Sequence, residues 1–256
     1  MIPYEYFVNE STLNIFTDAS IVHKTAKTQN GECKFYVGSP GSMLYIGDKL
    51  VDEYHSVLPD CTNNQSEITA ILYGVQRGLS FACMNSFIKN INIFSDSKIC
   101  IYGLREWIFK WIKNMNNGVL YSTSGEVINQ YIFVSIIKHV IDGNRDIRFY
   151  HVRGHCNPLN FKDRVKFRNS FMKENYLDTY IEDRLIDFFI SANDAVDNIT
   201  RDELHRLPED FLTTGYISTD MIVKSHTNPH KDRIFNWNEF IRSLDLNKYK
   251  KLIGGI

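Results

Sequence analysis

The stretch Leu13-Asn-Ile-Phe-Thr-Asp18 alternates apolar and polar residues and ends on a carboxylate, and Ile91-Asn-Ile-Phe-Ser-Asp96 repeats the same pattern. Alternation over this length is typical of a β-strand. If the two strands are neighbours in one sheet, Asp18 and Asp96 converge on one edge of it. A single aspartate at a strand end is usually a turn or cap residue, so the pair needs support from the rest of the chain.

The segments around these two strands predict an α/β fold. Further strands are expected at 33–39 and 42–46, joined by a turn at Pro40-Gly41, and at 51–57 and 147–152. Helices are expected at 66–81, 99–111, 126–141, 158–190 (largely helical), 192–205 and 236–251. This order favours helices layered on a mixed sheet.

Composition points to a protein of the cytoplasm. No run approaches the roughly 18 apolar residues of a membrane span, and the start lacks the basic and apolar segments of a secretory signal. The five cysteines are scattered without paired spacing, which indicates reduced thiols and not a disulfide framework or zinc site.

The formal net charge of −1 hides two oppositely charged blocks. Residues 138–173 hold nine lysines and arginines against three acids, and residues 174–210 hold eleven acids against three arginines. A basic block of this kind can follow a phosphate backbone. Two ordinary solvated faces would give the same counts, and charge alone leaves both interpretations open.

Two more acids complete a candidate metal site. Glu67 begins a predicted helix after Thr62-Asn-Asn-Gln-Ser, and Asp197 ends Asn193-Asp-Ala-Val-Asp197. Carboxylates held close together repel one another unless cations neutralise them. Oxygen ligands suit Mg²⁺ or Mn²⁺, and two such ions can support hydrolysis of a phosphodiester.

Seven motifs, in the order of a known family, make this pattern specific. They are Ile15-Phe-Thr-Asp18, Thr62-Asn-Asn-Gln-Ser-Glu67, Ile93-Phe-Ser-Asp96, Trp107-Ile-Phe-Lys-Trp111, Gly125-Glu-Val-Ile-Asn129, His151-Val-Arg-Gly-His155 and Asn193-Asp-Ala-Val-Asp197. On these motifs the chain resembles the type 1 ribonuclease H family over about 12–155 and again over about 192–204. The resemblance implies a ribonuclease H-like fold, with a mixed five-stranded sheet flanked by helices.

The resemblance also implies roles for particular residues. Asp18, Glu67, Asp96 and Asp197 would bind two Mg²⁺ ions, for which Mn²⁺ can substitute, and His155 would assist product release or proton transfer. The expected nucleic-acid contacts are Asn63 and Asn64 in the minor groove, Thr62 and Asn129 at a DNA phosphate, and Trp107 and Trp111 against DNA sugars. Core packing is the alternative for both tryptophans.

The largest departure from the family pattern follows His155. Asp197 comes 42 residues later, far beyond the family spacing, so a mostly helical insertion is expected at about 158–190. This leaves Asp194 as a rival to Asp197. One hypothesis for the insertion is that Lys162, Arg164, Lys166 and Arg168 lie along a hybrid strand; a solvated face is the alternative.

The expected organisation is a ribonuclease H-like domain over 1–205 and an extension of unknown role over 206–256, whose His226 and His230 are read as loop residues. The expected activity is cleavage of the RNA strand of an RNA–DNA hybrid, by a monomer without membrane contact. Richness in Asn, Ile and Lys would fit a phage or virus, and then the host cytoplasm. The alternatives are a catalytically silent hybrid- or protein-binding module and a resolvase- or integrase-like DNA nuclease.

Overall fold

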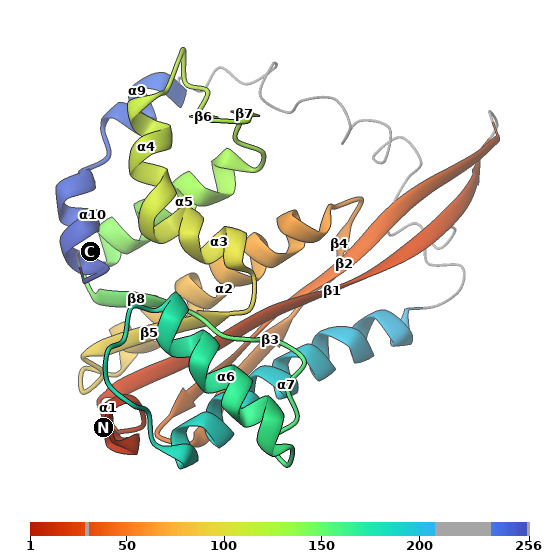
Figure 1. Ribbon diagram of the computed structural model, residues 1–256. Helices are drawn as coiled ribbons and strands as arrows, with labels where there is room; N and C mark the ends of the chain where they lie inside the picture. The colour runs from red at the N-terminus through yellow and green to blue at the C-terminus, as the bar shows by residue number, and fades with distance from the viewer. Residues whose placement is uncertain (29–30, 208–236, 255–256) are drawn as a thin grey trace.

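A mixed sheet runs through the middle of the molecule (Figure 1). The computed structural model describes residues 1–28, 31–207 and 237–254. The strand order is β3-β2-β1-β5-β8. The strands are β1 (Thr12–Thr28), β2 (Gly31–Ile46), β3 (Lys49–His55), β5 (Asn90–Ser95) and β8 (Asp146–His151), and a short β4 (Leu58–Pro59) also pairs with β2. β1, β5 and β8 are parallel, whereas β2 is antiparallel to β1 and β3, so the predicted α/β class with a mixed sheet is confirmed.

Alternation along the strands divides the interior into two cores. Ile15 and Ile93 face one side of the sheet, and Phe16 and Phe94 face the other, where their rings stack with centroids 4.6 Å apart. Side chains of a strand point to opposite faces in turn, so each strand supplies both cores. The sheet is therefore covered on both sides.

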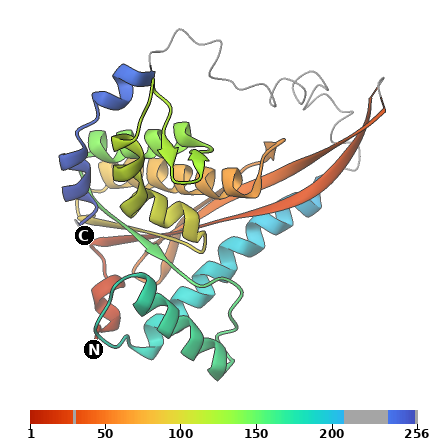
Figure 2. The ribbon, with the colours of Figure 1, turned by 45° about the horizontal axis from the view of Figure 1, so that its top comes forward.

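Helices cover each face (Figure 2). The Ile15 side carries α2 (Asn63–Met84), α3 (Lys98–Tyr102), a π-helical turn η1 (Gly103–Trp107), α4 (Ile108–Lys113), α5 (Gln130–Gly143), α9 (Trp237–Arg242) and α10 (Leu246–Leu252). The Phe16 side carries α1 (Tyr4–Phe7), α6 (Phe161–Glu174) and α7 (Asp183–Arg206). A small hairpin, β6 (Tyr121–Ser122) with β7 (Gly125–Glu126), precedes α5 and was not predicted.

The predicted turn at Pro40-Gly41 is wrong, because β2 continues through it. The Pro40 carbonyl accepts a hydrogen bond from the Ser56 amide at 3.1 Å. In a strand the N–H and C=O of one residue point to the same side, so the missing N–H of Pro40 faces the β3–β4 connection and removes no bond to β1. With β2 uninterrupted, β1 and β2 extend as a long two-stranded ribbon (Figure 1).

Several predicted helix boundaries also differ from the structure. The helix expected at 126–141 begins only at Gln130, and the one expected at 99–111 is divided by η1. The apolar stripe before residue 190 and the expected helix at 192–205 belong to one helix, α7. The helix expected at 236–251 is divided into α9 and α10, because Asp245 caps a new helix by accepting a hydrogen bond from the Lys248 amide at 2.9 Å. Most of the expected extension, with His226 and His230, lies outside the described residues.

Within the described ranges, no helix has the length and apolar character required to cross a bilayer.

Candidate active site

Three carboxylates meet at one edge of the sheet. Asp96 directly follows β5, and Glu67 lies in the first turns of α2. Asp18 lies inside β1, so the predicted strand end at this residue is wrong, because β1 stays paired with β2 as far as Thr28. One oxygen from each of the three lies within 4.8 Å of the others. The parallel register of Thr17 with Ser95 explains why the two aspartates emerge side by side.

The start of α2 is fixed by its cap. The Thr62 hydroxyl accepts a hydrogen bond from the Gln65 amide at 3.2 Å, which satisfies one of the free amides at the helix end. Glu67 then projects inward and is only 7% exposed.

Burial and mutual repulsion make this cluster electrostatically unfavourable. Burial is the largest cause that raises the pKa of Asp18, Glu67 and Asp96, and the neighbouring carboxylates raise it further. The Glu67 Oε2 atom is buried and has no hydrogen-bond partner among the described residues. An oxygen-only cluster with an unpartnered buried oxygen fits a hard divalent cation.

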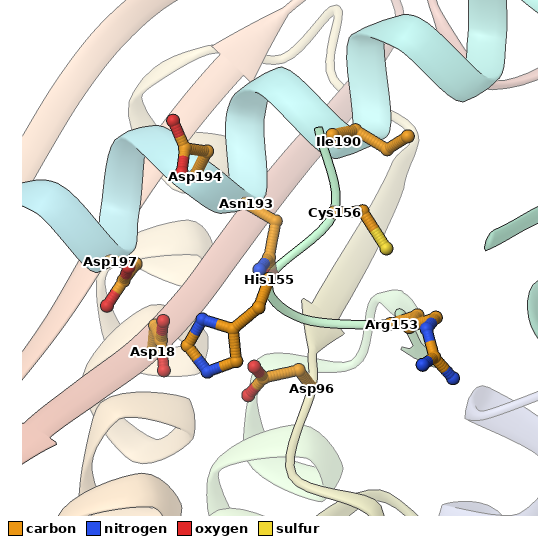
Figure 3. A pocket seen from close by; sticks show the side chains of 9 residues that line it. All are labelled: Asp18, Asp96, Arg153, His155, Cys156, Ile190, Asn193, Asp194 and Asp197. Atoms are coloured by element: carbon orange, nitrogen blue, oxygen red, sulfur yellow. The ribbon is translucent and has the colours of Figure 1, made fainter. Parts of the chain in front are cut away.

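Asp197 is placed beside this trio by α7 (Figure 3). Its charge raises the pKa of Asp18, Glu67 and Asp96, and its Oδ2 pairs with Nη1 of Arg201 at 3.1 Å. Asp194 borders the same pocket but points away from Asp18 in Figure 3 and accepts a hydrogen bond from Asn198 at 3.3 Å. The geometry therefore favours Asp197 over Asp194 as the fourth carboxylate.

The loop after β8 passes close to Asp96. His155 has a left-handed backbone (φ 52°), and its ring lies near Asp18 and Asp96 in Figure 3. Its charge lowers the pKa of Asp96, which burial raises. A Cβ at Gly154 would lie 2.1 Å from the Asp96 Oδ2 atom, so a side chain at this position would displace the Asp96 carboxylate.

Five of the six predicted nucleic-acid contacts line one groove of about 720 Å³. They are Thr62, Asn64, Trp107, Trp111 and Asn129, whereas Asn63 is exposed outside its lining. Trp111 is 8% exposed and packs edge-on against Phe133, with ring centroids 5.3 Å apart, so it serves the core as well. Trp107 is half-buried and lies 6.0 Å from Trp111 between ring centroids.

Sequence reasoning missed several residues of the pocket at Asp197. Arg153 and Asn193 line it, and Arg201 pairs with Asp197. Asn193 is 4% exposed, and its Oδ1 has no hydrogen-bond partner within the described part of the chain. The spacing in the sequence could have identified two of them, because Asn193 and Arg201 lie four residues before and after Asp197 and so share its helix face.

Two of the four cations in the hybrid-strand hypothesis form ion pairs within the protein. Arg164 pairs with Asp187 at 2.8 Å and with Asp183 at 3.7 Å, and Arg168 pairs with Asp183 and is largely buried. These arginines join α6 to α7, which favours the packing alternative for both of them. Lys162 and Lys166 are exposed.

Comparison with known proteins identifies the family. The family model for RNase H matches residues 10–162. Ribonuclease H of Wolbachia pipientis wMel is 33% identical over 89 residues, which are 33% of this chain and 54% of the relative, so the chain spans about half of that protein's length. Ribonuclease HI of Rickettsia conorii is 32% identical over 124 residues, which are 47% of this chain and 70% of the relative.

Solved structures with similar chains include RNase H1 from the halophilic archaeon Halobacterium salinarum NRC-1. It has 14% identity and a TM-score of 0.38, and the match covers 64% of this chain and 98% of that one. The PFV RNase H domain has 14% identity and a TM-score of 0.45, with 64% and 94% covered. Because the family model matches more than half of the sequence, this chain is a member of the RNase H family with a ribonuclease H-like fold.

Proposed function

We propose that this protein is a ribonuclease H, an endonuclease that hydrolyses the RNA strand of an RNA–DNA hybrid with the help of Mg²⁺. The observation that carries the proposal is the meeting of Asp18, Glu67 and Asp96 within 4.8 Å at the sheet edge. Family membership and the relatives named ribonuclease H support the same activity. Mn²⁺ is expected to substitute for Mg²⁺, because both take oxygen ligands.

Each carboxylate has a distinct task in this proposal. Asp18 and Asp96 would hold two ions, while Glu67 and Asp197 would each favour one of them. Bound divalent ions would activate a water molecule and stabilise the leaving oxygen. The water oxygen joins the phosphorus, the bond to the 3′-oxygen breaks, and that oxygen takes a proton. The products are a 3′-hydroxyl and a 5′-phosphate.

The remaining site residues would position the substrate. Glu67 would sense the 2′-hydroxyl next to the scissile phosphate, and Asn63 and Asn64 would read the minor groove beside it. The groove lined by Thr62, Trp107, Trp111 and Asn129 would take the DNA strand. His155, on its loop beside Asp96, would help to move a proton or release the product.

Replacing Asp96 tests the metal-dependent reaction. Asp96→Asn removes a ligand charge but keeps the size of the side chain, so cleavage should fall by at least about 1,000-fold, given that metal stabilisation amounts to several kcal/mol. Hybrid binding should stay within a few-fold of wild type. The measurement is cleavage of a labelled hybrid in Mg²⁺, with binding measured separately.

Asp142→Asn is the matched control, because Asp142 is an exposed residue that pairs with Lys138 at the end of α5. Near wild-type turnover of Asp96→Asn would refute the metal assignment. Duplex DNA and duplex RNA are assayed in parallel. Preference for duplex DNA would indicate a DNA nuclease, and binding without cleavage by the wild type would indicate a silent binding module.

A further inference from the structure

Within the inserted segment, α6 ends in two buried polar side chains beside β8, the last strand of the sheet. Glu174 closes α6 and is 9% exposed, and Asn175 follows it at 7%. Buried polar groups are costly unless they are hydrogen-bonded, so their partners reveal what the pair does.

Asn175 takes the place of a missing neighbouring strand. β8 is the terminal strand of the sheet, so one side of its backbone has no strand partner. The Asn175 Oδ1 atom accepts a hydrogen bond from the His151 amide at 2.9 Å, and its Nδ2 donates to the His151 carbonyl at 2.8 Å. One side chain thereby satisfies both backbone groups at the end of β8.

His151 in turn contacts the segment that carries Asp96. It is the register partner of Ser95, the residue before Asp96. Its Nε2 atom lies 3.2 Å from the Asp96 backbone carbonyl. Three residues further on, Gly154 passes against the Asp96 carboxylate. A shift at the end of β8 would therefore reach both the backbone and the side chain of Asp96.

Glu174 contacts α3, the helix that follows Asp96. Its carboxylate accepts hydrogen bonds from Lys98 Nζ at 2.9 Å and from the Tyr102 hydroxyl at 2.5 Å, and both donors lie on α3, directly after Asp96. Arg105, 9% exposed, donates to the Glu174 carbonyl at 3.2 Å and to Asn175 Oδ1 at 3.1 Å. The end of α6 thus contacts both β8, which packs against Asp96, and α3, which follows it.

We infer that Glu174 and Asn175 form a positioning clamp that holds Asp96 in place for metal binding. This inference rests on the proposed function of the carboxylate cluster and goes beyond it, because it gives the insertion a task in the reaction. Residues that orient metal ligands from behind commonly affect metal affinity more than substrate affinity.

Asn175→Ala should raise the Mg²⁺ concentration required for half-maximal cleavage by about tenfold. At saturating Mg²⁺ the turnover and the KM for the hybrid should stay within a few-fold of wild type. Titration of the protein with Mn²⁺ by calorimetry, without nucleic acid, should show the same loss of affinity. Asn175→Asp keeps the acceptor for the His151 amide but loses the donor, so its affinity should be intermediate.

Tyr176→Phe is the control, because it removes a neighbouring hydrogen bond to Glu106 that reaches neither β8 nor Asp96. A lower melting temperature with unchanged Mn²⁺ affinity in Asn175→Ala would overturn the inference and leave only a structural role. If Asn175→Ala fails to fold, Glu174→Gln tests the clamp through its contacts with α3, and a loss of Mn²⁺ affinity is again expected. The Mn²⁺ titration requires no hydrolysis, so a protein that cuts no hybrid still tests the clamp.

Discussion

Asp194 and Asp197 lie on the same stretch of α7, and the choice between them decides the fourth ligand. Asp197 faces Asp18 in Figure 3 and has a side chain 17% exposed, whereas Asp194 is exposed and bonded to Asn198. Arg201 pairs with Asp197 and also lowers the pKa of Asp18. In the absence of metal, this arginine partly compensates the negative charge at the site.

Asp197→Asn should therefore lower Mg²⁺-dependent hybrid cleavage by about 100-fold, which corresponds to about 2.7 kcal/mol of lost stabilisation. Asp194→Asn is the matched partner on the same helix and should retain activity within about threefold of wild type, because surface changes of this kind have small effects. Both are measured at a fixed Mg²⁺ concentration below saturation. The opposite ranking would transfer the fourth ligand to Asp194.

The sequence predicted these carboxylates more completely than it predicted their surroundings. Asp18, Glu67 and Asp96 carry a local signal, since each stands in a recognisable motif after an apolar strand segment or at a helix start. Gly154 and Asn175 matter because of contacts with Asp96 and His151, which lie far away along the chain. Such contacts appear only when the chain is folded.

At the scale of elements, local signals misled where tertiary pairing overrides them. Pro40-Gly41 has the composition of a turn, yet β2 passes through it because the Pro40 nitrogen faces the β3–β4 connection, where no ladder bond is lost. The break between α9 and α10, in contrast, has a local cause in the Asp245 cap. The π-helical turn of η1 has no obvious signal in the sequence.

A hydrogen bond connects the π-helical turn η1 with α10, the last helix of the described chain. Tyr249 of α10 is fully buried, and its hydroxyl donates a hydrogen bond to the Leu104 carbonyl of η1 at 3.0 Å. Regular helical hydrogen bonding is interrupted in π-helical turns. A donor from α10 therefore supports the turn that precedes Trp107 and Trp111.

Tyr249→Phe should lower the free energy of unfolding by about 1–3 kcal/mol, because it leaves a buried carbonyl without this partner. Urea unfolding measures the change. Tyr36→Phe is the control, since Tyr36 is 42% exposed, so its hydroxyl is open to water. Equal stability of Tyr249→Phe and wild type would mean that the Leu104 carbonyl finds another donor or water.

At the scale of the whole molecule, the core extends beyond the part matched by the family model. Ile241, Leu244, Tyr249 and Leu252 are buried in the same cluster as Ile15 and Ile93. The end of the described chain is therefore part of the folded body on that side of the sheet. The domain boundary expected at 205 stays a prediction.

The buried carboxylate cluster links the stability of the whole fold to pH and metal. Asp18, Glu67 and Asp96 have raised pKa values in the folded protein, so the folded state binds more protons than the unfolded state above a pH of about 4. The stability contributed by these groups is then present at low pH and is lost as the pH rises through the raised pKa values. Bound Mg²⁺ would offset the repulsion and stabilise the fold by mass action.

In EDTA at pH 8, repulsion between the ionised carboxylates should therefore lower the melting temperature of the wild type. Asp96→Asn removes one charge, so at pH 8 in EDTA it should melt several degrees higher than wild type, as expected if about 1 kcal/mol is recovered in a domain of this size. Added Mg²⁺ should raise the wild-type melting temperature and raise that of Asp96→Asn much less. Asp142→Asn should follow the wild type in every condition, because Asp142 lies on the surface at the end of α5. An Asp96→Asn variant that melts below wild type in EDTA would show that Asp96 stabilises the metal-free fold. Repulsion among the buried carboxylates would then not destabilise the fold, and the argument that the cluster requires a cation would fail.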